Sequence, residues 1–318
     1  MHLASGGGLM SRLAILCPGQ GAQYPLMFEL ARQDEQARSL LQEWDLQQYL
    51  DLPLQEILAD DKLIFQNTYA QPLIVAASLA AWSALKNKLP APRLVMGYSV
   101  GELSAYAVAG SLSVNDALAL ATVRAKLMDN ARAQTGAQHM LSVGGLAFGS
   151  LAETLQRHGL YVAIIVGDAS FIIGGLTASI MQAIPDFHEL GAETSLIPVE
   201  IASHTPLMQA AVPGFQKELE ARVFGDPGIP VMSGIGAELT FRQDAAKTQL
   251  LRQLTETIRW ADCMDSCAEQ GITVALELGP GAALSSMLQK RHPGIACRSV
   301  RDFRSLAGLL AWVDRFYP

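Results

Sequence analysis

Short apolar runs alternate along this chain with longer stretches in which apolar residues recur every three or four positions. The runs 13–17, 94–96 and 273–278 have the length of buried strands. A glycine-containing turn and then a helical pattern follow each of them. This alternation predicts an α/β fold built around a parallel sheet.

Between residues 137 and 199 the pattern changes to strand, helix, two strands, helix and strand. The order βαββαβ is that of a ferredoxin-like unit. We therefore expect a discontinuous α/β domain formed by 12–136 and 200–318, interrupted by a small subdomain at 137–199. Residues 1–11 lack the basic start and long apolar stretch of a signal peptide, and we interpret them as a flexible leader.

The run 94–96 ends in Gly97-Tyr98-Ser99-Val100-Gly101, and a helical pattern begins at once. This layout is typical of a nucleophile elbow, in which a serine sits on a sharp turn between a strand and a helix. The free N–H groups of the helix N-terminus would face developing negative charge. The alternative is an ordinary strand–turn–helix junction without a catalytic role, because a five-residue motif of this kind is weak evidence by itself.

Arg124 falls on the apolar stripe of a helix predicted over about 113–132. Its neighbours three and four positions away are all apolar, so its own helix offers no carboxylate. A buried guanidinium is costly unless it is paired. Either a distant acid such as Glu200 or Glu277 pairs with Arg124, or its partner is the carboxylate of a ligand.

The joint order of several motifs resembles the malonyl-CoA:acyl-carrier-protein transacylase family, over nearly the whole chain from about residue 13. The motifs are Pro18-Gly-Gln-Gly-Ala-Gln23, Ala70-Gln-Pro72, Gly97-Tyr-Ser-Val-Gly-Glu102, Arg124, Ser203-His204, the stretch 253–260 and Glu277-Leu-Gly-Pro-Gly281. The resemblance implies an α/β-hydrolase-like core with an inserted ferredoxin-like subdomain. It also implies an [acyl-carrier-protein] S-malonyltransferase that binds no cofactor and uses malonyl-CoA and a carrier-protein thiol as substrates.

The resemblance assigns a role to each site residue. Ser99 would be the nucleophile and His204 its base, oriented by the backbone carbonyl of Gln253. Arg124 would bind the free carboxylate of the malonyl group. The remaining two residues would build the oxyanion hole: Gln20 and the backbone N–H of Val100.

One departure narrows the resemblance, since the family usually has histidine where Tyr98 stands. The form Gly-Tyr-Ser-Val-Gly-Glu is similar to the transacylase (epsilon) subunit of biotin-independent malonate decarboxylases, so we expect that role and possible contacts with other decarboxylase subunits. The transacylase of fatty-acid or polyketide synthesis is the main alternative. In either case the partner is a transiently bound acidic carrier protein, for which we expect a basic docking patch: Lys290, Arg291, Arg298, Arg301 and Arg304.

Composition narrows the function classes further. The formal net charge of −7 argues against nucleic-acid binding, and no apolar run reaches the length of a membrane span. The four cysteines show no metal-ligand spacing, so we expect no metal and a cytoplasmic enzyme. Two alternatives of other classes remain: a serine esterase that would use the late His292, and a non-catalytic subunit of a complex.

Overall fold

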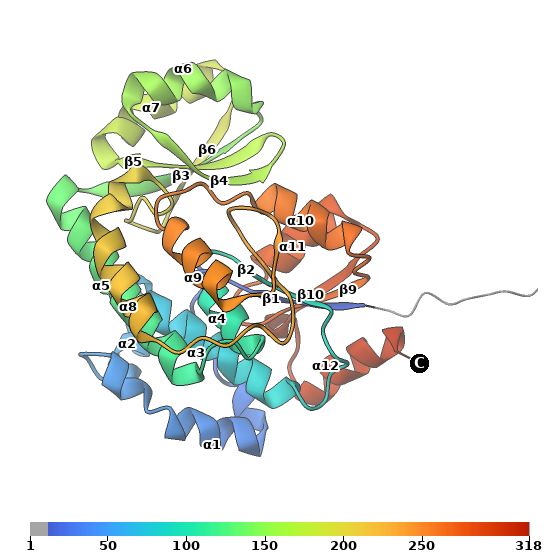
Figure 1. The fold of residues 1–318 in the computed structure, drawn as a ribbon. Coiled ribbons are helices and arrows are strands. Elements are labelled where there is room, and N and C mark those ends of the chain that lie inside the picture. Colours follow the sequence, from blue (N-terminus) through green and yellow to red (C-terminus); the bar gives the residue numbers. More distant parts are fainter. Residues whose placement is uncertain (1–11, 318) are drawn as a thin grey trace, which may run out of the picture.

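The computed structural model describes residues 12–317 as two sheets with their helices (Figure 1). The predicted leader lies outside these residues. The larger sheet has the order β10-β9-β1-β2-β7-β8. Its strands are β1 Leu13–Cys17, β2 Leu94–Gly97, β7 Val231–Met232, β8 Leu239–Thr240, β9 Val274–Glu277 and β10 Ala296–Ser299. All neighbours pair in parallel except β7 and β8, so the predicted α/β fold class is confirmed.

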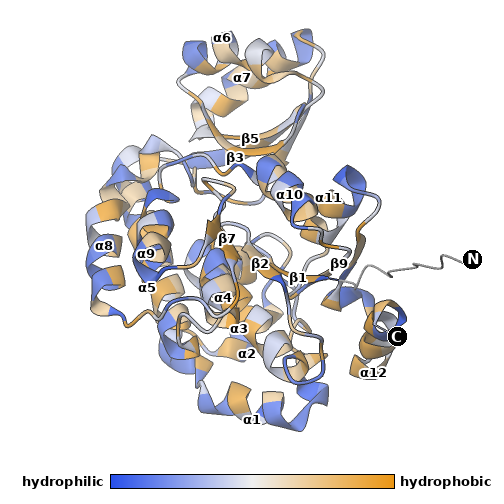
Figure 2. Ribbon diagram, turned by 45° about the vertical axis from the view of Figure 1, so that its right-hand side comes forward, coloured by the Kyte–Doolittle hydropathy of each residue, from blue (hydrophilic) through white to orange (hydrophobic). Residues whose placement is uncertain are grey.

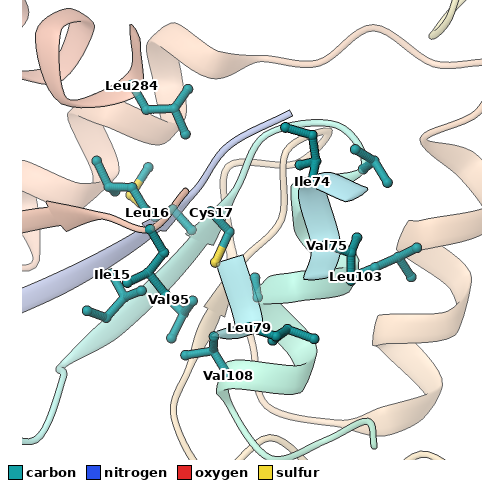
Figure 3. Packing of buried hydrophobic residues seen from close by; sticks show 14 of the residues in the cluster. Ile15, Leu16, Cys17, Ile74, Val75, Leu79, Val95, Leu103, Val108 and Leu284 are labelled. Carbon is teal, nitrogen blue, oxygen red and sulfur yellow. The ribbon is translucent and has the colours of Figure 1, made fainter. Parts of the chain in front are cut away.

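The larger sheet is packed between helices that come from both ends of the chain. These helices are α1 Glu35–Glu43, α2 Leu54–Ala59, α3 Asn67–Leu85, α4 Gly101–Val108, α5 Val114–Thr135, α8 Val212–Ala221, α9 Gln243–Arg252, α10 Trp260–Glu269, α11 Ala283–Arg291 and α12 Leu306–Val313. Every residue of β1 and β2 is buried, and hydrophobic residues gather around β2 and β7 (Figure 2). Figure 3 shows Val95 of β2, Leu79 of α3 and Val108 of α4 in the same apolar cluster. Both faces of the central strands are therefore covered, as continuous apolar runs require.

Helix α3 begins earlier than the sequence pattern indicates. Proline is common at the first position of a helix, so the sequence predicts a start at Pro72. The helix instead starts at Asn67 and contains Pro72 in its second turn. The N–H groups of Tyr69 and Ala70 already donate to the Gln66 carbonyl, at 2.9 and 2.8 Å. A proline so close to the start removes only one intrahelical hydrogen bond. The prediction of a start at Pro72 was wrong, and the earlier start places Gln71 inside the buried helix.

The smaller sheet is antiparallel with the order β4-β5-β3-β6. It consists of β3 Gln138–Gly144, β4 Tyr161–Gly167, β5 Ser170–Leu176 and β6 Glu193–Ile197, together with α6 Phe148–His158 and α7 Thr177–Glu189. Both helices lie on the side away from the larger sheet (Figure 1). The element order is βαββαβ, consistent with a ferredoxin-like unit, while the division at 136/137 and 199/200 stays a prediction.

The two faces of the smaller sheet belong to different apolar clusters. Ile173 of β5 packs with α6 and α7 in a separate small core. Its neighbour Ile172, which points the opposite way, joins the main core of the molecule. Strand β4 is also attached to the main body, because the Ile258 N–H donates to the Ala163 carbonyl at 2.9 Å and the Ile165 N–H donates to the Ile258 carbonyl at 2.8 Å. The smaller sheet is thus held over the larger one by backbone pairing.

Candidate active site

The elbow predicted after β2 is present, with Ser99 between β2 and α4. Ser99 has φ +56°, a left-handed conformation that is uncommon for a residue with a side chain. Two glycines allow this turn to be tight. A Cβ atom on Gly97 would collide with the backbone of Glu102, and one on Gly101 would collide with the Cys17 carbonyl. The strained turn and close packing are the features expected of a nucleophile elbow.

His204 lies directly beside Ser99, although it comes 105 positions later in the chain. Its Nε2 is 2.8 Å from Ser99 Oγ, and its Nδ1 is 2.5 Å from the backbone carbonyl of Gln253. Because a carbonyl only accepts, the proton of the neutral ring lies on Nδ1 and Nε2 is free to accept from the serine. No carboxylate of the described residues takes the place of the Gln253 carbonyl, so Ser99 and His204 form a dyad rather than a triad.

The environment of His204 keeps its ring neutral. The side chain is 2% exposed, and burial, together with the positive charge of Arg124, lowers its pKa to about 3. The hydrogen bond to the Gln253 carbonyl opposes this shift only in part. A neutral imidazole with a free Nε2 is the form that can take a proton from Ser99.

Arg124 is buried without an acidic partner. It is 3% exposed and donates to Gln71 Oε1 at 2.7 Å and to Gln253 Oε1 at 3.3 Å. Within residues 12–317 it forms no ion pair. Both acids considered in the sequence analysis are engaged elsewhere: Glu200 pairs with Arg132 at 2.7 Å, and Glu277 accepts from the Ser285 N–H at 2.8 Å. A pairing of Arg124 with either acid is therefore excluded by the structure.

The guanidinium keeps its charge despite this burial. Burial lowers the pKa of Arg124 to about 10, and the carboxylate of Glu102 acts in the opposite direction. Two neutral amides satisfy some of its N–H groups, but they do not balance a positive charge. An anion of the right size would therefore be bound strongly at this position.

Ser99, His204 and Arg124 face one cavity of about 130 Å³ between the two sheets. The elbow, helices α3 and α5 and the loop that carries Ser203 and His204 supply the polar part of the lining, and the smaller sheet and Val199 supply the apolar part. The lining residues are Gly19, Gln20, Gln71, Tyr98, Ser99, Arg124, Met140, Ile164, Ile172, Ile197, Val199, Ser203 and His204. A candidate nucleophile and a candidate anion-binding group thus share one small cavity.

The two predicted oxyanion-hole residues border the same space. Gln20 lines the cavity, and the N–H of Val100 has no hydrogen-bond acceptor among the described residues. Val100 precedes the first residue of α4, so its N–H belongs to the free donors of a helix N-terminus. The side-chain Oε1 of Gln20 is buried and also lacks a partner in the described part of the chain.

Three residues at the site received no role from the sequence. Gln71 positions the Arg124 guanidinium and donates to Asn67 Oδ1 at 2.7 Å. Tyr98 lines the cavity and packs edge-on against Trp260, with ring centroids 5.1 Å apart. Glu102 follows the elbow and is fully buried. All three fall within motifs that the sequence shows, but their partners lie far away along the chain.

The residue required by the esterase alternative lies elsewhere. His292 is bonded to Asp265 Oδ1 at 2.8 Å and does not line the cavity with Ser99. The described part of the chain contains no group of three or more histidine, cysteine or acidic side chains that could hold a metal ion. None of the helices in residues 12–317 combines the length and the apolar character needed to cross a membrane.

Comparison with known proteins identifies the family. The family model described as the acyl transferase domain matches residues 15–302. The chain belongs to this acyltransferase family. The malonyl CoA-acyl carrier protein transacylase of Haemophilus influenzae is 29% identical, over 93% of this chain and 97% of that protein. The protein of the same name from Mycobacterium bovis is 30% identical, over 93% of this acyltransferase and 100% of its own length.

Solved structures show the same fold. The crystal structure of FabD from Acinetobacter baumannii has a TM-score of 0.87 and 30% identity, covering 97% of this acyltransferase and 99% of that chain. A malonyl-transacylase solved in complex with its type II polyketide synthase acyl-carrier protein has a TM-score of 0.83 and 25% identity, covering 96% and 100% of the two chains. The likeness therefore extends over both sheets of the acyltransferase.

Proposed function

We propose that the protein transfers the malonyl group of malonyl-CoA to the phosphopantetheine-type thiol of an acyl carrier protein, through a malonyl ester on Ser99. The observation that carries this proposal is Arg124, a buried cation without an acidic partner that faces the same cavity as the Ser99–His204 dyad. The relatives named as malonyl CoA-acyl carrier protein transacylases support the same substrates.

In the first half-reaction His204 Nε2 takes the proton of Ser99 as Oγ attacks the thioester carbonyl. The tetrahedral oxyanion accepts hydrogen bonds from the Val100 N–H and from a donor at Gln20. The intermediate then breaks its C–S bond, and CoA leaves as a thiol with the proton from His204. In the second half-reaction the carrier thiol gives its proton to His204 and attacks the ester, and Ser99 recovers a proton.

Arg124 selects malonyl over acetyl groups. The malonyl carboxylate accepts hydrogen bonds from the guanidinium directly, whereas an acetyl group leaves the guanidinium with its two amide partners alone. The apolar wall contributed by the smaller sheet strengthens this attraction, because it excludes water from the cavity.

Two kinds of carrier protein are candidates for the acceptor. The named relatives support the carriers of fatty-acid or polyketide synthesis more directly. Tyr98, which stands at the cavity where the family usually has histidine, favours a second candidate, the carrier of a biotin-independent malonate decarboxylase with its dephospho-CoA-type arm. The rate of malonyl transfer to each purified holo-carrier would decide between them, and a preference for the fatty-acid carrier would exclude the decarboxylase role.

Of the expected basic docking patch, Arg291 is already engaged. It is bonded to Asp265 at 2.6 Å and to Asp168 at 3.2 Å, while Arg298 and Arg301 stack on the rings of Phe303 and Tyr24. The docking role of this patch stays a prediction, and Lys290 and Arg304 are the members to test by charge reversal. An unchanged KM for the carrier protein would argue against the patch.

Mass spectrometry of the intact protein tests the chemistry directly. After brief exposure to malonyl-CoA we expect one added malonyl group, which disappears when a holo-carrier protein is supplied. Acetyl-CoA should label the protein far less. Malonylation of a Ser99→Ala variant to the same extent would refute the proposed intermediate.

A further inference from the structure

Glu102 is a buried carboxylate that the proposed reaction does not use. It is 1% exposed and lies in the first turn of α4, three residues after Ser99. Its Oε1 accepts from the Gly234 N–H at 2.7 Å. Its Oε2 is buried and has no hydrogen-bond partner among the described residues. A fully buried carboxylate with a free oxygen is unusual, because such oxygens are normally bonded.

Among the groups that interact with Glu102, Arg124 carries a charge and the others are neutral. Tyr106 on α4 and Cys263 on α10 both interact with Glu102, and burial raises the pKa of each, so both stay neutral. The Gln253 amide at the end of α9 is uncharged and accepts a hydrogen bond from Arg124. The charge of Arg124 favours the ionised form of Glu102, and Glu102 in turn favours the charged form of Arg124.

Glu102 is poised to exchange a proton near neutrality. Burial raises its pKa to about 7, although the Gly234 N–H, the Gln253 side chain and the Arg124 charge all favour ionisation. A malonyl carboxylate bound at Arg124 would bring a second negative charge to the guanidinium whose charge already acts on Glu102. Like charges in a low-dielectric site disfavour each other, so the loaded site favours the protonated form of Glu102.

We propose that Glu102 takes up a proton when a malonyl carboxylate occupies Arg124, so that the buried site keeps one anion for its one cation. This inference rests on the proposed function, because it requires malonyl binding at Arg124. Below about pH 7 Glu102 of the empty enzyme is already protonated, and malonyl-CoA binds without proton uptake. Above this range the proton comes from solution, so the affinity for malonyl-CoA falls by up to about tenfold per pH unit.

Acetyl-CoA provides an internal control, since it has the same thioester and no free carboxylate. Its binding should therefore be insensitive to the state of Glu102. The ratio of the KM values for malonyl-CoA and acetyl-CoA in the unmodified enzyme should rise between pH 7 and 8.5. This measurement needs no variant, so it stands even if a substitution at Glu102 prevents folding.

Calorimetry can count the proton. Binding of malonyl-CoA to a Ser99→Ala protein at pH 8, in buffers of different ionisation enthalpy, should show uptake of about one proton. Acetyl-CoA should show none. A Ser99→Ala protein that also carries Glu102→Gln should bind malonyl-CoA without uptake, because the amide still accepts from the Gly234 N–H and carries no charge.

Glu277→Gln is the matched control. Glu277 is also a buried carboxylate with a pKa raised by burial, but it bonds to Ser285 and its charged neighbour is Asp302 rather than Arg124. The Ser99→Ala protein with this change should still take up the proton. Undiminished uptake in the Glu102→Gln protein, or a malonyl-to-acetyl KM ratio that is flat with pH, would overturn the inference while leaving a malonyl-Ser99 adduct intact. Failure to form that adduct would overturn the proposed function and this inference together.

Discussion

The two walls of the cavity differ in both chemistry and backbone. One wall carries Ser99 after β2, Arg124 of α5 and His204 of the loop after β6, which are held by hydrogen bonds. The wall from the smaller sheet presents aliphatic side chains such as Ile164 and Ile172. In the proposed reaction the first wall supplies nucleophile, base and cation. The second wall would limit the access of water and lower the local dielectric, which would make the charges on the first wall more effective.

The backbone shows the same contrast. Ser99 and His204 both have left-handed φ values, +56° and +62°, whereas every residue with a side chain in the strands of the smaller sheet has an ordinary conformation. Such residues cost about 1–3 kcal/mol each and persist only where their surroundings fix them. Here the close packing of Gly97 and Gly101 fixes one, and the hydrogen bond from the His204 N–H to the Leu254 carbonyl holds the other. The reactive wall is thus the strained one.

Removal of the nucleophile should have the largest effect. A Ser99→Ala protein should lose malonyl transfer by at least about 10⁴-fold, and His204→Ala should lose nearly as much, because the two side chains act as a unit. Single-turnover transfer to a holo-carrier measures this loss. Combining both substitutions should add little, and fully additive losses would show that Ser99 and His204 act independently.

Loss of the cation should abolish selectivity. We expect Arg124→Ala to reduce the malonyl-over-acetyl ratio of kcat/KM by roughly 10²- to 10³-fold, because the variant lacks the guanidinium that would bind the malonyl carboxylate. Arg132→Ala, on the same helix, is the control, since Arg132 pairs with Glu200 and does not line the cavity. Equal ratios for Arg124→Ala and the unmodified enzyme would remove the main support for malonyl as the substrate.

The apolar wall can be tested with two adjacent residues. Ile172 faces the cavity and Ile173 faces the separate core under α6 and α7. Ile173→Ala should lower the free energy of unfolding by about 2–5 kcal/mol. Ile172→Ala should instead admit water and speed hydrolysis of the acyl-enzyme several-fold, as measured by loss of label. A variant of Ile172 with an unchanged acyl-enzyme lifetime would show that this wall does not control water access.

Much of the fold was accessible from the sequence because its signals are local. The buried run before Ser99 and the glycines on either side of it predict the elbow, and the change of period after residue 137 predicts a second sheet. The apolar neighbours of Arg124 predict that it is buried without a partner on its own helix. Each of these inferences uses residues within one or two helical turns, where spacing alone determines which side chains share a face.

The parts that sequence did not predict depend on contacts between distant segments. Gln71 reaches Arg124 across 53 positions, and Gly234 reaches Glu102 across 132. No spacing rule indicates that such pairs meet. The start of α3 was missed for a different reason, since proline is common in a first turn and also tolerated just after it. Without that earlier start, Gln71 would not lie on a helix facing Arg124.

The smallest expected effect concerns the pH dependence of acylation. The pKa of His204 is lowered to about 3, which is about two and a half units below pH 5.5. More than about 99% of His204 side chains would therefore be neutral at pH 5.5. The acylation rate at saturating malonyl-CoA should therefore change less than about twofold between pH 5.5 and 8. An exposed histidine with an ordinary pKa near 6.5 would lose about tenfold over the same range. Rapid-quench measurement of malonyl-Ser99 formation distinguishes the two, and an acid limb near pH 6.5 would mean that the apolar wall does not keep His204 dry during the reaction.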